Sequence, residues 1–292
     1  SASSAFDTQT FTLGADWSYP ITEYQFLRFG FALQQAEMIT SQFSSRQANE
    51  WVTNNGAPFD VPGAGFSGTS VKSLELTTGW SYDSRNRFLF PTAGTRFGLS
   101  LTAAVPGSEV EYYVASLDFA KYIPLWGSWI FKINSALALG EAYGETTALP
   151  PYRNFFAGGP GTVRGFKESR LGPKDSFNNP HGGNLKVATQ FELIVPMPEA
   201  FSESARMSLF YDIGNVFSTG GVTFFDLLGD VTTEYEYRAD NLKQSFGVAV
   251  EWLAPMGLLR FSYSLPLNPS EATDRFFEDE TEEFQFTVGS AF

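Results

Sequence analysis

The sequence predicts an all-β protein, a transmembrane antiparallel β-barrel, on three observations. Apolar side chains alternate with small or polar ones along many short segments. The apolar positions of these segments carry almost no charge, and the connections between them alternate between short and long. Aromatic residues make up 16% of the chain, yet it contains no run of about 18 apolar residues, so we expect no transmembrane helix.

Eleven segments show a period of two, which is the period of a strand with two unlike faces. From Phe11 to Tyr19 every odd position is apolar and every even position is small or polar, and Leu27 to Gln34 repeats the pattern. In chain order, the predicted strands are 8–19, 24–40, 70–82, 95–105, 111–122, 129–142, 184–196, 206–217, 242–253, 258–266 and 282–292.

The two faces of these strands favour a membrane barrel over a soluble sandwich. Along 245–250, for example, one face is Phe and Val and the other is Ser, Gly and Ala. Single charges are scattered along the polar face: Arg28, Glu75, Lys132, Glu192, Asp212, Glu251 and Arg260. A soluble sandwich would expose a face rich in Lys, Glu and Thr. A charge-free outer band suits lipid, and a mixed interior suits a water-filled lumen.

The connections fit the same architecture, because outer-membrane barrels have short periplasmic turns and long extracellular loops. The long connections are 41–69, 143–183, 218–241 and 267–281, and they fall on every second connection, where 106–110 alone is short. This places the C-terminus on the periplasmic side. An odd strand number is unusual for such barrels. Either the chain is the C-terminal piece of a larger barrel, or a strand within 41–69 or 218–241 escapes the pattern.

Other functions are disfavoured by the composition. A net charge of −13 argues against nucleic-acid binding, which needs a basic face. The absence of cysteine excludes a disulfide framework and a thiolate metal site. His181 is the single histidine, so a histidine-based metal centre is excluded and a hydrolase with a histidine base is disfavoured. We expect no cofactor, no metal and no enzymatic activity.

The longest loop, 143–183, holds the segment with the strongest functional signal. Four glycines surround one arginine, Arg164, and they are Gly158, Gly159, Gly161 and Gly165. The segment lacks the Gly-Lys-Ser/Thr ending of a phosphate-binding loop. It also carries apolar side chains that are unfavourable in water: Phe155, Phe156, Val163 and Phe166. A loop of this length is more often functional than structureless, and we expect it to fold into the barrel lumen.

Inside a lumen, Arg164 needs a carboxylate partner, because a guanidinium removed from water is otherwise costly. The alternation of the two strands that follow the loop points Glu192 and Asp212 to the lumen. We predict that Arg164 bridges to one or both and fixes the loop. The alternative is that both carboxylates are ordinary lumen charges facing water.

The segment 158–166, Gly-Gly-Pro-Gly-Thr-Val-Arg-Gly-Phe, resembles the Val-Arg-Gly-Phe motif of the BamA family of outer-membrane protein assembly factors. The segments 83–94, 211–217, 252–263 and 283–292 also resemble family sequence, so the similarity runs from about Thr8 to the end. It implies a sixteen-stranded barrel preceded by periplasmic POTRA domains. Residues 1–292 would then be its C-terminal part, without the first five strands and the POTRA domains. The family's arginine maps to Arg164, and its partners map to Glu192 and Asp212.

By this resemblance, the protein folds and inserts β-barrel proteins into the bacterial outer membrane. The implied partners are unfolded barrel clients, periplasmic assembly lipoproteins, and outer-membrane lipid with lipopolysaccharide. Two other functions stay open. A two-partner secretion transporter shares a looser form of the loop motif, whereas a passive porin would lack the motif and conduct ions.

The last predicted strand has two possible roles. Its outward residues Phe284, Phe286, Val288 and Phe292 form an alternating pattern ending in an aromatic residue, which resembles the signal by which barrel clients are recognised. The same strand would form the seam with the first strand of the barrel. Gly289 is a plausible weak point of that seam, or packs against a lumen side chain. Deleting Phe292 is predicted to lower membrane insertion.

Overall fold

The chain forms one large antiparallel sheet in the computed structural model, which describes residues 6–41, 44–61 and 66–289. Eleven strands follow one another along the sheet in chain order, each hydrogen-bonded to the next. They are β1 (Phe6–Thr22), β2 (Gln25–Thr40), β4 (Phe66–Asp83), β5 (Gly94–Ala104), β6 (Tyr112–Pro124), β7 (Ile130–Ala142), β9 (Leu185–Val195), β10 (Ala205–Phe217), β13 (Lys243–Ala254), β14 (Gly257–Pro266) and β16 (Phe284–Gly289). All eleven predicted strands are confirmed. Within the described residues the last strand covers Phe284–Gly289, and residues 290–292, with Phe292, lie outside them.

The two faces of the sheet differ as the alternation predicts. On β13, Phe246, Val248 and Trp252 are exposed on one face, while Ser245 is fully buried on the other. Direct cross-strand pairing continues this order, since Phe246 lies opposite Leu265 and Val248 opposite Tyr263. One face of the sheet is therefore an exposed apolar surface of the kind that contacts lipid, and the other carries the polar groups and the loops.

Several short elements lie in the long connections and are not predicted by the alternation. The first such connection holds α1 (Arg46–Asn54) and β3 (Ala57–Val61), and β3 pairs with β4. The side chain of Ser45 caps α1 by accepting from the amide of Ala48 at 3.1 Å. The remaining short strands are β8 (Gly165–Phe166), β11 (Phe224–Phe225), β12 (Val231–Thr232) and β15 (Thr281–Glu282), and the 3₁₀ turns are 126–128, 151–153 and 239–241.

These elements do not lengthen the path of eleven strands. The hairpin β11–β12 and the pair β15–β8 form separate small sheets. The 41–69 and 218–241 segments therefore do contain strands that escaped the alternation, but none of them is inserted between two of the eleven. No helix in the described part of the chain is long and apolar enough to cross a membrane.

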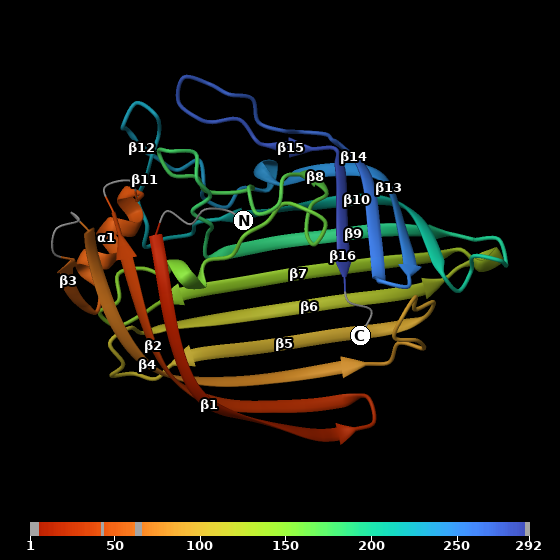
Figure 1. Ribbon diagram of the computed structural model, residues 1–292, viewed down its shortest axis with the longest axis horizontal. Helices are drawn as coiled ribbons and strands as arrows, with labels where there is room; N and C mark the ends of the chain where they lie inside the picture. The colour runs from red at the N-terminus through yellow and green to blue at the C-terminus, as the bar shows by residue number, and fades with distance from the viewer. Residues whose placement is uncertain (1–5, 42–43, 62–65, 290–292) are drawn as a thin grey trace.

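The sheet is curved, with β1 at one edge and β16 at the other (Figure 1). Because consecutive strands are antiparallel, every second connection emerges at the same end. The long connections share one end, where α1, β3, β11 and β12 lie at the left of Figure 1, together with the short connection between β5 and β6. The other connections lie at the opposite end. This arrangement agrees with the sides assigned from the loop lengths. At the end with the long connections, the loop 267–281 contacts both 143–183 and 218–241, since Glu280 pairs with Arg170 and Arg275 with Asp226.

Candidate functional site

The arginine motif lies in the connection between β7 and β9, and it is packed rather than free. Its apolar residues Val163 and Phe166 are fully buried and form a cluster with Ala157, Leu171 and Val216. Val216 belongs to β10, so this cluster attaches the loop to the sheet. The loop lies against the polar face of β9 and β10, because Gln190 on β9 donates to the carbonyl oxygen of Pro160 at 3.1 Å.

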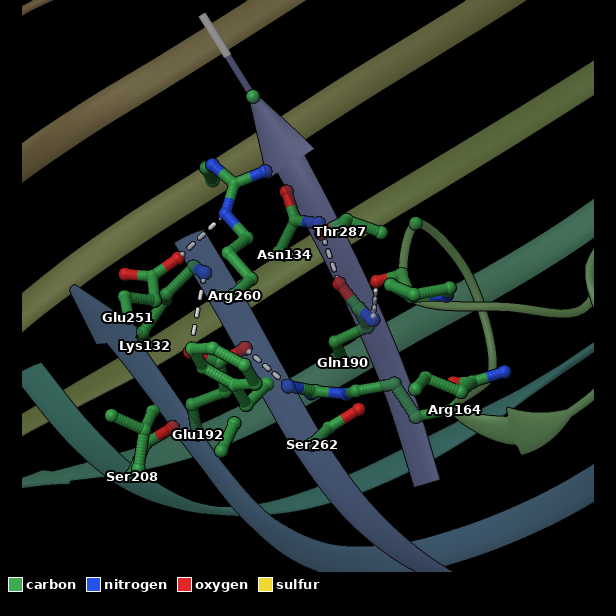
Figure 2. A pocket seen from close by; sticks show the side chains of 18 of the residues that line it. Lys132, Asn134, Arg164, Gln190, Glu192, Ser208, Glu251, Arg260, Ser262 and Thr287 are labelled. Carbon is green, nitrogen blue, oxygen red and sulfur yellow. Dashed lines mark hydrogen bonds and ion pairs between the residues drawn. The ribbon is translucent and has the colours of Figure 1, made fainter. Parts of the chain in front are cut away.

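Arg164 is the centre of a buried charge cluster. Its backbone amide and its Nε both donate to Oδ2 of Asp212, at 3.0 and 2.7 Å, and its Nη2 donates to Oδ1 at 2.7 Å. Its Nη1 lies 3.1 Å from Oε1 of Glu192. The guanidinium also stacks over the ring of Phe210, 3.5 Å from the ring centroid. Figure 2 shows Arg164 pointing toward Glu192 from the loop.

Lys132 on β7 completes the cluster. Its Nζ lies 3.2 Å from Oε2 of Glu192, so Glu192 is shared between two cations. Two positive and two negative groups therefore meet in a space with little access to water, since Asp212 is fully buried and Arg164 is 5% exposed. Bidentate geometry and a balanced charge are what make such a buried pair tolerable. The structure thus brings Arg164, Glu192 and Asp212 together, as the strand alternation predicts.

The loop glycines divide into two kinds. Gly158, Gly159 and Gly165 have positive φ angles of 105°, 88° and 86°, a region that disfavours other residues. At Gly165, an added Cβ would also lie 3.0 Å from Cβ of Ser264 on β14. Gly161, in contrast, has nothing within 4 Å of such a Cβ and no positive φ. The motif conformation therefore requires glycine at 158, 159 and 165, but not at 161.

Arg153 forms a second anchor, which the alternation of the strands does not predict. Its Nη2 donates to both carboxylate oxygens of Glu75 on β4, at 2.6 and 2.8 Å, and to Oε1 of Gln34 on β2 at 2.6 Å. Its Nε donates to the hydroxyl of Tyr112 at 2.9 Å. The alternation places Glu75 as a single charge on the polar face of its strand. It does not indicate that the partner is Arg153 in the long loop. The loop is thus attached to both halves of the sheet.

On the last strand, Phe284, Phe286 and Val288 all point outward, and each is about half exposed. Phe286 stacks on Phe261 of β14, with ring centroids 4.9 Å apart. At Gly289, an added Cβ would meet one described atom, the carbonyl oxygen of Leu258, at an ordinary 3.7 Å. Among the described residues, no lumen side chain packs against Gly289, and the weak-point hypothesis stays a prediction.

A polar cavity of about 460 Å³ lies between the arginine motif and the last strands. Figure 2 shows its lining, in which Arg260 reaches Glu251 and Lys132 reaches Glu192, with Thr287 of β16 on the far side. The cavity walls carry charged, amide and hydroxyl side chains among apolar ones such as Phe261 and Val250, as suits a water-filled lumen. In the described ranges, no group of three or more His, Cys, Asp or Glu side chains could hold a metal ion.

Comparisons with known proteins agree with this architecture. The family model described as the Omp85 superfamily domain matches residues 1–292. The outer membrane protein assembly factor BamA of Neisseria meningitidis is 31% identical over 98% of this chain, and a SAM50-like protein of Drosophila melanogaster is 25% identical over 86%. The crystal structure of BamA from Haemophilus ducreyi lacking POTRA domains 1–3 covers 99% of the chain, with a TM-score of 0.82 and 27% identity. The chain spans 37% and 52% of the two sequence relatives and 55% of the solved chain.

Proposed function

The chain belongs to the Omp85 superfamily, and from this we propose that it is the membrane part of an outer-membrane protein assembly factor, which folds and inserts other β-barrel proteins. The observation that carries the proposal is the buried arginine motif, in which Arg164 is held by Glu192 of β9 and Asp212 of β10. β16 is the last strand of the described sheet and pairs with β14 over Leu258–Tyr263. In the complete barrel, its other edge would meet the first strand, and the two would form the proposed seam.

An open strand edge is what barrel insertion requires. A client strand cannot enter hydrocarbon while its N–H and C=O groups are unpaired, because each unsatisfied group costs several kcal/mol there. An edge such as that of β16 offers a row of backbone donors and acceptors, on which a client strand can pair by β-augmentation.

We propose the bacterial outer membrane as the location, with lipopolysaccharide and lipid against the exposed apolar face. The clients are unfolded β-barrel proteins, and periplasmic lipoproteins assist. The process involves pairing and transfer of strands without covalent chemistry, so the protein is not an enzyme and uses no cofactor. Residues 1–292 are proposed to be the C-terminal part of a larger barrel protein with POTRA domains.

The proposal is tested by reconstituting the complete protein into liposomes of bacterial phospholipid and adding an unfolded barrel client. The folded client is followed by its heat-modifiable migration in gel electrophoresis. We expect client folding to be accelerated relative to liposomes containing an unrelated barrel of similar size. Equal rates in the two preparations would contradict the proposal. Steady ion conductance without client folding would favour a porin, and export of a dedicated partner would favour a secretion transporter.

A further inference from the structure

The segment that leads into β16 is attached to the arginine motif, and Gln285 is the residue at the junction. Gln285 is 4% exposed and points to the lumen side. Its Nε2 donates to the carbonyl oxygen of Phe166 at 2.8 Å, and its Oε1 accepts from the amide of Gly165 at 3.4 Å. One side chain of the last strand thus satisfies two backbone groups of the motif.

The backbone around this junction is paired as well. Thr281 and Glu282, which form β15, pair with Phe166 and Gly165 of β8 in an antiparallel bridge. The amide of Lys167 donates to the carbonyl oxygen of Glu280 at 2.9 Å. Every residue from Gly165 to Lys167 therefore contacts the segment 280–285.

Glu280 adds charge to the same contact. Its Oε2 lies 2.9 Å from Nζ of Lys167, and its Oε1 forms an ion pair with Arg170. Burial raises the pKa of Glu280, but hydrogen bonds from Arg170 and Lys167 outweigh it, and the pKa lies below its ordinary value. The carboxylate is therefore charged at neutral pH, and both loop cations hold it.

From these contacts we infer that Gln285 and Glu280 couple the last strand to the arginine motif, so that the motif controls how readily the edge of β16 is released. The inference rests on the proposed function and names its regulation. Asp212 fixes Arg164 to β10, and the next two residues, Gly165 and Phe166, are held by Gln285 of β16. The loop thus links β10 to β16 directly. In the sheet itself, these two strands are connected only through β13 and β14.

Gln285 is thus a positioning residue, and its role is tested by hydrogen exchange in the complete protein without any client. Gln285→Ala is expected to increase amide exchange in 284–289 about tenfold, because two buried hydrogen bonds are lost. Glu280→Gln is expected to increase it about threefold, as partly exposed ion pairs contribute less. Thr287→Ala is the matched control, on the same strand and face, and is expected to change exchange less than twofold.

A double-mutant cycle with Asp212→Asn tests whether the arginine motif and the last strand are coupled, or whether Gln285 only stabilises its own strand. Asp212→Asn loosens the motif where it is attached to β10, away from Gln285. In the wild-type background, Asp212→Asn should raise exchange in 284–289, and in the Gln285→Ala background it should add little. Increased exchange in the loop with no change in 284–289 would overturn the coupling. If Gln285→Ala fails to fold, the same cycle is run with Glu280→Gln. Because no client is present, this result is independent of whether the proposed insertase activity is found.

Discussion

The fully buried carboxylate of Asp212 accepts three hydrogen bonds from Arg164. One comes from the backbone amide of Arg164, at 3.0 Å, and two come from its guanidinium, both at 2.7 Å. The backbone bond fixes the path of the loop, and the two guanidinium bonds fix the direction of the side chain. Glu192 contributes a single contact at 3.1 Å and shares its charge with Lys132. The two carboxylates are therefore unequal partners, although the strand alternation makes them look equivalent.

Asp212→Asn is expected to destabilise the motif loop more than Glu192→Gln does. The amide at 212 leaves a buried guanidinium with one remaining carboxylate, and breaking a buried pair typically costs about 3–5 kcal/mol. After Glu192→Gln, Arg164 keeps its bidentate partner, but Lys132 loses its carboxylate, so we expect about 2 kcal/mol. The rates of protease cleavage within 154–170, measured in detergent micelles, report the difference. Equal cleavage rates in the two variants would contradict this ranking.

Gly158→Ala is expected to loosen the same loop, whereas Gly161→Ala should leave it unchanged. At Gly158, φ is 105° and an added Cβ would lie 2.3 Å from the carbonyl oxygen of Lys167, so the backbone must shift. The cost of such strain is about 1–3 kcal/mol. Gly161 has open space around it and serves as the matched control. Gly158→Ala should have a lower thermal midpoint and a faster cleavage rate than Gly161→Ala. If Gly158→Ala changes neither value, the loop accommodates the added Cβ without strain.

The sequence predicts the strands well because lipid and lumen impose a period of two on every segment that crosses the membrane. The same period points Glu192 and Asp212 to the lumen. It carries no information on which loop residue meets which strand, and the Arg153–Glu75 contact joins positions 78 residues apart. It also gives no signal for α1 or β3, because these lie in a long connection outside the path of eleven strands. The contact of Gln285 with the motif depends on how the last loop folds back, which alternation does not determine.

Arg153→Ala is expected to release the first part of the long loop without releasing the motif. The substitution removes the cation that contacts Glu75, Gln34 and Tyr112, and leaves the Glu75 carboxylate buried at 5% exposure. We expect a loss of about 3 kcal/mol, in line with other broken buried pairs. Amide exchange should increase in 146–156, while 162–166 stays protected by Asp212.

The control for this second anchor is Glu75→Gln combined with Arg153→Ala. Once both charges are absent, the uncompensated carboxylate is gone, and much of the lost stability should return. Additive losses from the two substitutions would show that the residues do not act as a pair.

Acidification is expected to loosen the end of the long loop through His181, which packs edge-on against the ring of Phe224 at 5.4 Å. Burial lowers the pKa of His181 to about 4, and the nearby charge of Asp175 opposes this shift in part. The folded loop therefore favours the neutral imidazole. Its contribution to stability is complete above the ordinary pKa of 6.5 and is lost as the pH falls toward 4, by up to about tenfold in the folding equilibrium for each pH unit.

The measurement is amide exchange in 173–183 from neutral pH to about pH 5, corrected for the intrinsic pH dependence of exchange. Glu280, whose pKa is already below 4.5, stays charged in this window and does not contribute. His181→Leu is the matched variant, since it keeps an apolar contact with Phe224 and cannot be protonated. Its exchange should be independent of pH over this range. A pH response that persists in His181→Leu would assign the effect to other groups.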